Sequence, residues 1–450
     1  MLLATRQRRQ GFRIFYSDYD DNAGRVVKPS KPDRIKPIDW LTLSCYAPYA
    51  LHVLPQRSRF MDTAVQPAAG VDRADLVRRL LGHLDAKSTR LADNVYFEPA
   101  RGYIDPDQFA GEVDKLFRRS PLWVAWSAEL PNAGDYKAIE IAQVPMIFLR
   151  GKDGSVRGFR NSCTHRGATL LPEGTGCIGR RIVCPYHAWS FDHDGKLTGI
   201  PHDQGFAPLD RSQRGLTAIP VQEKYGMIFA CADPDGQFDL DDHLSGLGPE
   251  LGAHGWANFT AGNTRTISCA SNYKLAMDTY CEAYHFPYVH TNSLPTAIPN
   301  TMEVDNFGHH IRMTYPFGPI DELRGRPDGE LAQAVLGQHM FIVYIIFPNV
   351  AVVTTDFGAS AYQVLPGAVV GESTTTDHQI VTGAADDDLK SMIVAGLDYN
   401  FSLVDTEDYP LSERVFRSLR AGTPSALVFG RNEPALHLLH DSFNAATSAQ

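Results

Sequence analysis

The stretch of sequence that decides the fold runs from Cys163 to His187 and reads CTHRGATLLPEGTGCIGRRIVCPYH. Two of its three cysteines and both of its histidines form two matched pairs, Cys163-Thr-His165 and Cys184-Pro-Tyr-His187, with 18 residues between the pairs. Thiolate and imidazole groups are the usual protein ligands of zinc and of iron–sulfur centres. A Cys/His pair on each of two loops can therefore enclose a metal site between hairpins.

The order of ligand types within each pair separates the two kinds of metal site. A zinc finger usually presents two cysteines and then two histidines. Here each pair mixes one cysteine with one histidine, which favours a [2Fe–2S] centre whose two cysteines hold one iron and whose two histidines hold the other. We therefore expect Cys163, His165, Cys184 and His187 to bind such a cluster, with structural zinc as the alternative. Cys177, between the pairs, is expected to be an inert loop thiol.

The residues around these pairs predict a small all-β domain. From about Leu122 to Ala232 the sequence consists of short β-rich runs separated by turns. The runs are Ala138–Ile141, Met146–Leu149, Ile182–Val183 and Met227–Ala230, and the turns are Lys152–Gly154 and Asp192–Gly195.

The sequence on either side predicts helices and further strands. Apolar residues recur at helical spacing after Asp72 and again after Asp105-Pro106, so two core-packing helices begin there. The apolar stretch 341–353 contains a proline and an asparagine and predicts two buried strands around a turn. Helical stretches are expected at 386–420 and 433–445.

A second group of ionisable residues lies on a predicted buried helix over residues 272–285. Asp278, Glu282 and His285 are spaced i, i+4 and i+7, which places them on one stripe of that helix. Burying unpaired carboxylates is costly, so these acids should pair, hydrogen-bond or bind metal. We expect Asp278 and Glu282 to take part in catalysis.

Two histidines of this region could share one metal ion. We expect Pro287 to end the helix, so that His290 can turn back toward His285. Two imidazoles and one carboxylate, with open positions on the metal, are the ligands of non-haem Fe(II) oxygenases. Glu282 could be that carboxylate, or it could orient His285 through its other ring nitrogen. The residue types leave both roles open, and the segment alone also fits two structural histidines beside a buried acid pair.

The two groups in this order resemble the catalytic (alpha) subunit of the Rieske non-haem iron oxygenases, the ring-hydroxylating dioxygenase family. The likeness covers roughly residues 103–443 and rests on the two Cys/His loops and on the segment 272–290. Three residues depart from the usual pattern of that family. Tyr273 stands in place of Trp, Ala188 in place of Gly, and Thr279 at a position often held by Asn.

The resemblance implies roles for individual residues. His285 and His290 correspond to the two iron-binding histidines, and Glu282 to the carboxylate that bridges the cluster and the iron of neighbouring subunits. The third iron ligand of relatives is an aspartate in an Asp-rich turn before a helix. This aspartate corresponds to Asp408, with Asp405 as the second choice.

The resemblance also implies an α+β fold, in which a small all-β Rieske domain precedes a catalytic domain built as a helix-covered antiparallel β-sheet. The expected division is a basic and poorly ordered extension over residues 1–60, N-terminal helices over 61–120 that pack on the catalytic domain, the Rieske domain over 121–235 and the catalytic domain over 236–450. Residues 1–60 carry 11 Lys or Arg against 5 Asp or Glu.

The implied function is that of a terminal oxygenase with a [2Fe–2S] cluster and a mononuclear Fe(II). It would take electrons from NAD(P)H through a separate reductase, with or without a ferredoxin, and use O2 to hydroxylate an aromatic or related small hydrophobic substrate. An alternative is a monooxygenase or demethylase acting on a quaternary amine or methyl ether. A Rieske electron carrier and a zinc-stabilised binding module are the non-enzyme alternatives. The family forms homotrimers, and some members add a small beta subunit.

Composition argues against several other classes of protein. A chain of 450 residues with 43% hydrophobic and 21% charged residues is an ordinary globular protein. Its net charge of −10 argues against nucleic-acid and membrane partners. Seven cysteines make no disulfide framework, and no apolar run has the length of a signal peptide core, so we expect a cytoplasmic protein. The metal-like spacing of His437 and His440 is expected to be structural.

Overall fold

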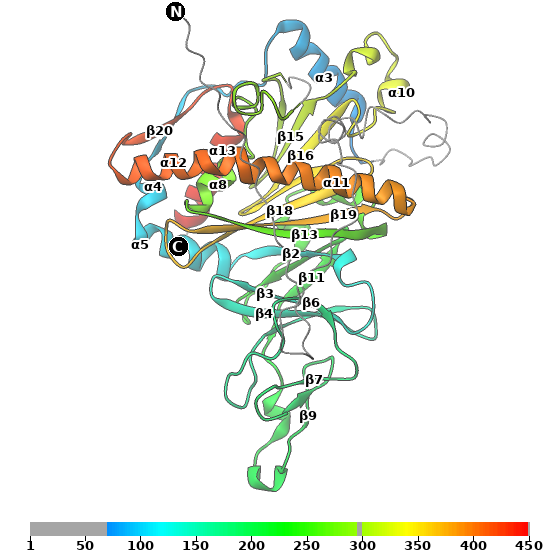
Figure 1. Cartoon of the computed structure of the whole chain (residues 1–450), viewed down its shortest axis with the longest axis vertical. Coiled ribbons are helices and arrows are strands. Elements are labelled where there is room, and N and C mark those ends of the chain that lie inside the picture. Colours follow the sequence, from blue (N-terminus) through cyan, green and yellow to red (C-terminus); the bar gives the residue numbers. More distant parts are fainter. Residues whose placement is uncertain (1–69, 295–298, 449–450) are drawn as a thin grey trace, which may run out of the picture. The chain divides into compact units, whose positions relative to one another are not determined.

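The structure is a computed structural model that describes residues 70–294 and 299–448 (Figure 1). The predicted basic extension over residues 1–60 lies outside the described residues. Of the helices in the described ranges, none is both long and apolar enough to cross a bilayer.

The largest element is an antiparallel sheet of seven strands in the order β13-β19-β18-β17-β16-β15-β14 (Figure 1). Its strands are β13 (Phe259–Cys269), β14 (Glu303–Phe307), β15 (His310–Pro316), β16 (Met340–Ile346), β17 (Val350–Thr354), β18 (Gly358–Pro366) and β19 (Ser373–Thr382). The two buried strands predicted within 341–353 are confirmed as β16 and β17.

Both faces of this sheet are covered, which explains why its central strands are apolar at nearly every position. Along β16, Val343 and Ile345 enter one hydrophobic core, whereas Ile342, Tyr344 and Ile346 enter the other. Successive side chains of a strand point to opposite faces, so a strand between two cores has no solvent-facing residues. The predicted helix-covered antiparallel sheet is confirmed.

Different helices supply the two cores. One core contains residues of α5, α8, α11, α12 and α13. The other contains residues of α3, α6, α7 and α10. The bounds are α3 (Arg73–Ala86), α4 (Arg101–Ile104), α5 (Pro106–Glu112), α6 (Leu240–His243), α7 (Gly248–Ala253), α8 (Tyr273–Asp278), α9 (Phe286–Val289), α10 (Asp328–Leu331), α11 (Asp387–Leu403), α12 (Tyr409–Arg420) and α13 (Pro434–Ser448).

The two helices predicted before the β-rich region are confirmed. The side chain of Asp72 accepts the backbone N–H of Asp75 and caps α3. The side chain of Asp105 caps α5, where Pro106 occupies a first-turn position that needs no hydrogen-bond donor. The chain then continues from α5 into a π-helical turn, η1 (Val113–Arg118).

The region from β2 to β12 is built from three small antiparallel sheets, with short helical turns as its only helical elements, so the predicted all-β domain is confirmed. The strand orders are β10-β5-β4-β3-β6, β11-β12-β2 and β7-β8-β9. The strands are β2 (Pro121–Trp126), β3 (Asp135–Ile141), β4 (Val144–Arg150), β5 (Val156–Arg160), β6 (Gly174–Cys177), β7 (Ile182–Val183), β8 (Ser190–Phe191), β9 (Leu197–Gly199), β10 (Ala218–Ile219), β11 (Val221–Lys224) and β12 (Met227–Cys231). Cys177 ends strand β6 and is not in a loop. The exact domain boundaries stay predictions.

A buried charge cluster joins the small sheets to the large one. Lys137 of β3 donates a hydrogen bond of 2.7 Å to Glu129, and its Nζ lies 3.2 Å from Nδ1 of His378 on β19. The indole N–H of Trp126 donates to the carbonyl of His378 at 2.9 Å. Burial raises the pKa of Glu129, but the charges of Lys137 and His378 outweigh that effect and lower it. The carboxylate therefore stays ionised inside the protein.

We expect Lys137→Met to lower the free energy of unfolding by about 3–5 kcal/mol, because it leaves the buried Glu129 carboxylate without its cation. Adding Glu129→Gln should recover part of that loss, since the uncompensated charge is then gone. Chemical denaturation measures both effects, with Lys152→Met at an exposed position as the control. Equal stabilities of Lys137→Met and Lys152→Met would contradict this account of the cluster.

Candidate functional site

The four residues of the first Cys/His group lie together on two loops. Cys163 follows β5, and Cys184 follows β7; both thiols are buried. The imidazole rings of His165 and His187 lie with their centroids 4.7 Å apart. The ring of His165 also stacks on Trp189, with centroids 4.7 Å apart and planes inclined by 7°. The structure thus gathers all four predicted ligands in one place.

Each of the two loops forms the same kind of turn directly after its cysteine. The backbone N–H of Gly167 donates to the carbonyl of Cys163 at 2.8 Å, and that of Ala188 donates to the carbonyl of Cys184 at 3.0 Å. Gly167 and Ala188 both adopt left-handed backbone conformations, with φ of 76° and 56°. A side chain with a Cβ pays ~1 kcal/mol in that conformation, so the Ala188 loop is strained where its counterpart is not.

The chemistry of these four residues fits a shared metal cluster. Within the described structure, the Nδ1 atoms of His165 and His187 are buried and have no hydrogen-bond partner. Burial raises the pKa of the Cys163 thiol, as does the neighbouring Cys184, while burial and the charge of His187 lower the pKa of His165. Two buried thiols and two imidazole nitrogens without hydrogen-bond partners are suitable ligands for a [2Fe–2S] cluster.

The predicted continuous helix over residues 272–285 is wrong. Helix α8 ends at Asp278, a non-helical turn follows, and the short helix α9 begins at Phe286. Pro287 lies in the first turn of α9 and therefore starts a helix instead of ending one. A helix running through 283–287 would clash at the proline ring and lack a hydrogen bond. Asp278, Glu282 and His285 consequently do not share one helical stripe.

The short helix α9 nevertheless brings the two histidines together. His285 is its N-terminal cap and His290 its C-terminal cap, and their ring centroids lie 5.2 Å apart. Asp408 approaches from a π-helical turn, η7 (Val404–Asp408), between α11 and α12. Its Oδ1 lies 3.4 Å from Nε2 of His285 and 3.3 Å from Nε2 of His290. One ligand atom from each of these three residues lies within 4.8 Å of the others, close enough to hold one metal ion.

A carboxylate binds the other ring nitrogen of each histidine. Glu282 accepts from Nδ1 of His285 and also from its backbone N–H at 3.0 Å. Glu407 lies 2.6 Å from Nδ1 of His290 and accepts from the Ser293 hydroxyl at 2.7 Å. Each imidazole is therefore held with Nδ1 in a hydrogen bond and Nε2 toward Asp408.

The electrostatics of this site favour a cation. Burial lowers the pKa of His290, but hydrogen bonds and charges from Asp408 and Glu407 outweigh burial and raise it. Several carboxylates thus surround two imidazoles in a partly buried space. A divalent iron bound by two nitrogens and one carboxylate would balance the negative charge of these carboxylates. The residues therefore fit such a site.

Sequence reasoning did not find Glu407. It lies directly before the predicted ligand Asp408, and that adjacency was the signal available in the sequence. Asp405, the second choice for the ligand, is exposed on the same π-helical turn and is absent from the group of close ligand atoms.

Asp278 lies in a different hydrogen-bond network from the histidine site. Its carboxylate accepts from the Tyr103 hydroxyl at 2.8 Å and lies 2.9 Å from Nε2 of His440. His437, the other half of the metal-like pair in the sequence, lies 3.0 Å from the carbonyl of Gly430. A catalytic role of Asp278 stays a prediction.

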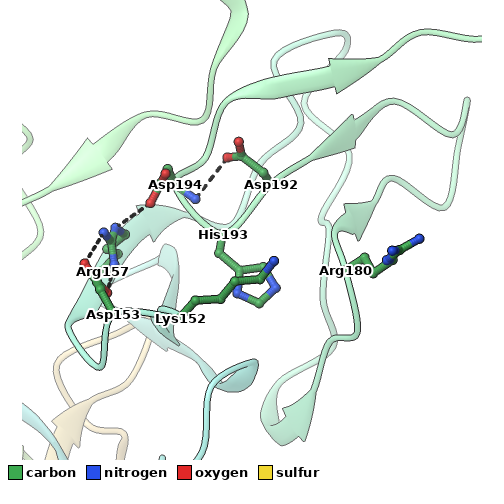
Figure 2. A pocket seen from close by; sticks show the side chains of 7 residues that line it. All are labelled: Lys152, Asp153, Arg157, Arg180, Asp192, His193 and Asp194. Carbon is green, nitrogen blue, oxygen red and sulfur yellow. Dashed lines mark hydrogen bonds and ion pairs between the residues drawn. The ribbon is translucent and has the colours of Figure 1, made fainter.

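Two surface pockets contain none of the predicted site residues. The first, of about 280 Å³, is shown in Figure 2 and is lined by Lys152, Asp153, Arg157, Arg180, Asp192, His193 and Asp194. In it, Arg157 lies between Asp153 and Asp194, at 2.8 Å and 3.0 Å. The second, of about 370 Å³, lies on α12 and is lined by Arg414, Arg417, Ser418 and Ala421.

We expect Glu407→Ala to weaken metal binding at the histidine site by about 10- to 100-fold, because His290 loses the group that orients its ring. Titration with Co(II), followed by its visible absorption, measures the affinity. Asp405→Ala is the matched control, since Asp405 lies on the same turn and is exposed. Wild-type affinity in Glu407→Ala, or an equal loss in Asp405→Ala, would refute this role of Glu407.

Comparison with known proteins agrees with this pair of sites. The family model for the Rieske [2Fe–2S] domain matches residues 120–213. The model for the ring hydroxylating alpha subunit (catalytic domain) matches residues 256–449. The first includes all four residues of the Cys/His loops, and the second includes both histidines of α9 and Asp408.

Curated relatives match part of the chain. The carnitine monooxygenase oxygenase subunit of Escherichia coli is 34% identical over 229 residues, which are 49% of this chain and 58% of that subunit. The glycine betaine monooxygenase oxygenase subunit of Chromohalobacter salexigens is 31% identical over 200 residues, which are 44% of each. The chain thus spans about half the length of these relatives.

Solved structures show the same fold. A crystal structure of the quaternary ammonium Rieske monooxygenase CntA superposes with a TM-score of 0.68 at 21% identity, covering 79% of this chain and 96% of that one. Naphthalene 1,2-dioxygenase from Rhodococcus sp. superposes with a TM-score of 0.66 at 19% identity, covering 84% and 98%. The chain thus contains a Rieske [2Fe–2S] domain followed by the catalytic domain of a ring hydroxylating alpha subunit.

Proposed function

We propose that this chain is the terminal oxygenase subunit of a Rieske oxygenase system. The observation that carries the proposal is the approach of His285, His290 and Asp408 to within 4.8 Å of one another in a chain that also has two Cys/His cluster loops. An electron carrier needs only the cluster loops, and a zinc-stabilised module needs only one metal site. The presence of both sites therefore favours an oxygenase.

The residues divide between two metal groups. Cys163 and Cys184 would hold one iron of the [2Fe–2S] cluster, and His165 and His187 the other. His285, His290 and Asp408 would hold the mononuclear iron. When bound, the cluster supplies single electrons and the Fe(II) supplies open positions for O2 beside the substrate.

Hydrogen bonds to two carboxylates fix which ring nitrogen of His285 and of His290 is available to bind a metal. Glu282 and Glu407 accept hydrogen bonds from the Nδ1–H groups of His285 and His290. These bonds favour the tautomer of each imidazole that has its proton on Nδ1 and a lone pair on Nε2, the atom that faces Asp408. The three ligands are thus oriented before any ion binds.

Glu282 would also link neighbouring subunits. Shortly after it in the sequence come Tyr284 and Tyr288, whose aromatic rings are exposed. The cluster loops likewise present the exposed Tyr186 and Val183. We propose a head-to-tail homotrimer in which the cluster loops of one copy face Glu282 of the next, so that electrons cross from the cluster to the iron. A separate reductase would supply them from NAD(P)H.

The proposed reaction is hydroxylation of a small substrate. One C–H bond of the substrate and O2, with two electrons and two protons, give one C–O–H group and one water. A quaternary amine is the substrate class favoured by the names of the carnitine and glycine betaine monooxygenase relatives and by a glutamate at the bridging position. Hydroxylation of an N-methyl carbon would then lead to C–N cleavage, in which the carbon leaves as an aldehyde.

Hydroxylation of an aromatic ring is the second candidate. An anthranilate 1,2-dioxygenase large subunit from Burkholderia cepacia is 33% identical over 197 residues, and the naphthalene dioxygenase fold superposes on this chain. In that reaction both oxygen atoms of O2 enter the product, whereas a monooxygenase inserts one. The isotope content of the product therefore separates the two candidates.

We expect the purified protein to consume O2 only when an electron donor and a substrate are both present. The panel should contain carnitine, glycine betaine, anthranilate and chlorobenzene, with product analysis under ¹⁸O₂. Asp408→Ala should abolish substrate-dependent O2 uptake and leave the cluster spectrum unchanged, whereas Asp405→Ala should retain turnover. A protein without iron, or full product formation by Asp408→Ala, would overturn the proposal.

A further inference from the structure

A buried network of ionisable side chains surrounds the end of helix α8. The Tyr103 hydroxyl donates to Oδ2 of Asp278 at 2.8 Å and lies 3.0 Å from Nε2 of His440. The same Nε2 lies 2.9 Å from Oδ1 of Asp278. On the other side of the ring, Nδ1 of His440 lies 3.7 Å from Oε2 of Glu98. His440 of α13 thus links Asp278 of α8 and Tyr103 of α4 on one side of its ring to Glu98 of β1 (Tyr96–Pro99) on the other.

These groups are almost completely removed from solvent. Tyr103 is 0% exposed, His440 1% and Glu98 4%. Burial raises the pKa of Glu98, and the charges of His440 and Lys274 act against that rise. Burying this many polar groups costs free energy, and their mutual hydrogen bonds and charges do no more than offset that cost. Apolar residues of similar size would stabilise the fold as well, so stability alone does not explain why these groups are present.

A second ion pair anchors the beginning of the same helix. Lys274 donates to Glu112 at 2.6 Å, and the Tyr273 hydroxyl donates to the other oxygen of Glu112 at 2.9 Å. Lys274 is 1% exposed and Glu112 is 2% exposed. Both ends of the six-residue helix α8 are therefore fixed by buried charges on neighbouring elements.

Helix α4 leaves room for this network through Gly102. A Cβ at that position would lie 2.7 Å from Oε1 of Glu98 and 3.7 Å from Nζ of Lys274. Contacts as short as 2.7 Å do not occur between real Cβ atoms and oxygen, so a side chain at Gly102 would displace Glu98. A Gly102→Ala variant thus disturbs the network without removing any of its polar groups.

The network lies at the start of the turn that joins α8 to α9 and carries Glu282 and His285. The backbone carbonyl of Asp278 accepts the N–H of Cys281 at 3.0 Å, which starts the turn that carries Glu282 and His285.

We propose that Tyr103, His440 and Glu98 are positioning residues that fix Asp278, and through it the turn that presents Glu282 and His285 to the mononuclear iron. This inference rests on the proposed function, because it concerns the same iron site. It gives a role to Asp278 and to His440, both of which lie outside the cluster of ligand atoms. The residues act through the backbone of the turn and do not touch the iron.

The test compares His440→Ala, His440→Gln and His437→Ala, using protein from which the mononuclear iron has been chelated while the cluster absorbance is retained. His437 lies on the same helix one turn earlier and has no part in the network, so it is the matched control. We expect His440→Ala to weaken Co(II) binding by about tenfold or more, the effect of losing a group that orients a ligand. His440→Gln keeps a donor near the position of Nε2 and should recover most of the affinity.

Two further variants separate positioning from stability. Lys137→Met is expected to destabilise the fold elsewhere, so it should lower the midpoint of thermal unfolding while keeping wild-type Co(II) affinity. Gly102→Ala should weaken Co(II) binding in the same direction as His440→Ala. If His440→Ala fails to fold, the other two variants decide the question. We then expect weaker Co(II) binding in Gly102→Ala and close to wild-type Co(II) binding in His440→Gln.

The outcomes distinguish this inference from the proposed function. Wild-type Co(II) affinity in His440→Ala or in Gly102→Ala, or an equal loss in His437→Ala, would overturn the positioning role alone. Wild-type protein that shows a cluster spectrum but binds no Co(II) at the histidine site would overturn the proposed function, and the positioning role with it.

Discussion

The mononuclear site depends on one repeated interaction, the hydrogen bond between a carboxylate and Nδ1 of each histidine. Glu282 holds His285 and Glu407 holds His290, and in both cases the remaining nitrogen, Nε2, faces Asp408. A histidine can offer either nitrogen to a metal, and the partner of the other nitrogen decides which one. Without these two carboxylates, the rings would be free to rotate and the three ligand atoms would not converge.

The fold supplies those carboxylates from two directions. Glu282 lies on the turn between α8 and α9, whereas Glu407 and Asp408 lie on the π-helical turn η7 between α11 and α12. A π-helical turn inserts an extra residue into a helical run, and such turns are frequent at functional sites. Here it lets two adjacent acids serve one site, one as a ligand and one as the partner of His290.

Local sequence patterns predicted much of this structure. The Cys/His spacing, the short strands around it, the helices capped by Asp72 and Asp105 and the paired strands β16 and β17 all follow from residue type and periodicity within one segment. The helix over 272–285 was predicted wrongly for a physical reason. Apolar periodicity gave it a helical pattern, but Pro287 and the side-chain bonds of Asp278 favour a turn followed by a new helix.

Sequence reasoning missed Glu407 and the pairing of His440 with Asp278, because both depend on long-range contacts. Glu407 and His290 are 117 positions apart, and His440 and Asp278 are 162 apart. No periodicity within a helix or strand contains such pairs, because they form only when separate elements pack. His440 in particular has the spacing of a surface metal pair with His437, yet in the fold its ring is buried against Asp278 and Tyr103.

The central claim is that paired carboxylates orient two histidines toward one aspartate around a single iron. The measurement that tests it most directly is anomalous diffraction at the metal edge from crystals loaded with Fe(II) or Co(II). The account predicts one peak bound by Nε2 of His285, Nε2 of His290 and the carboxylate of Asp408, with Glu282 and Glu407 on the Nδ1 atoms. A metal bound through Nδ1, or ligated by Glu282 in place of Asp408, would contradict it.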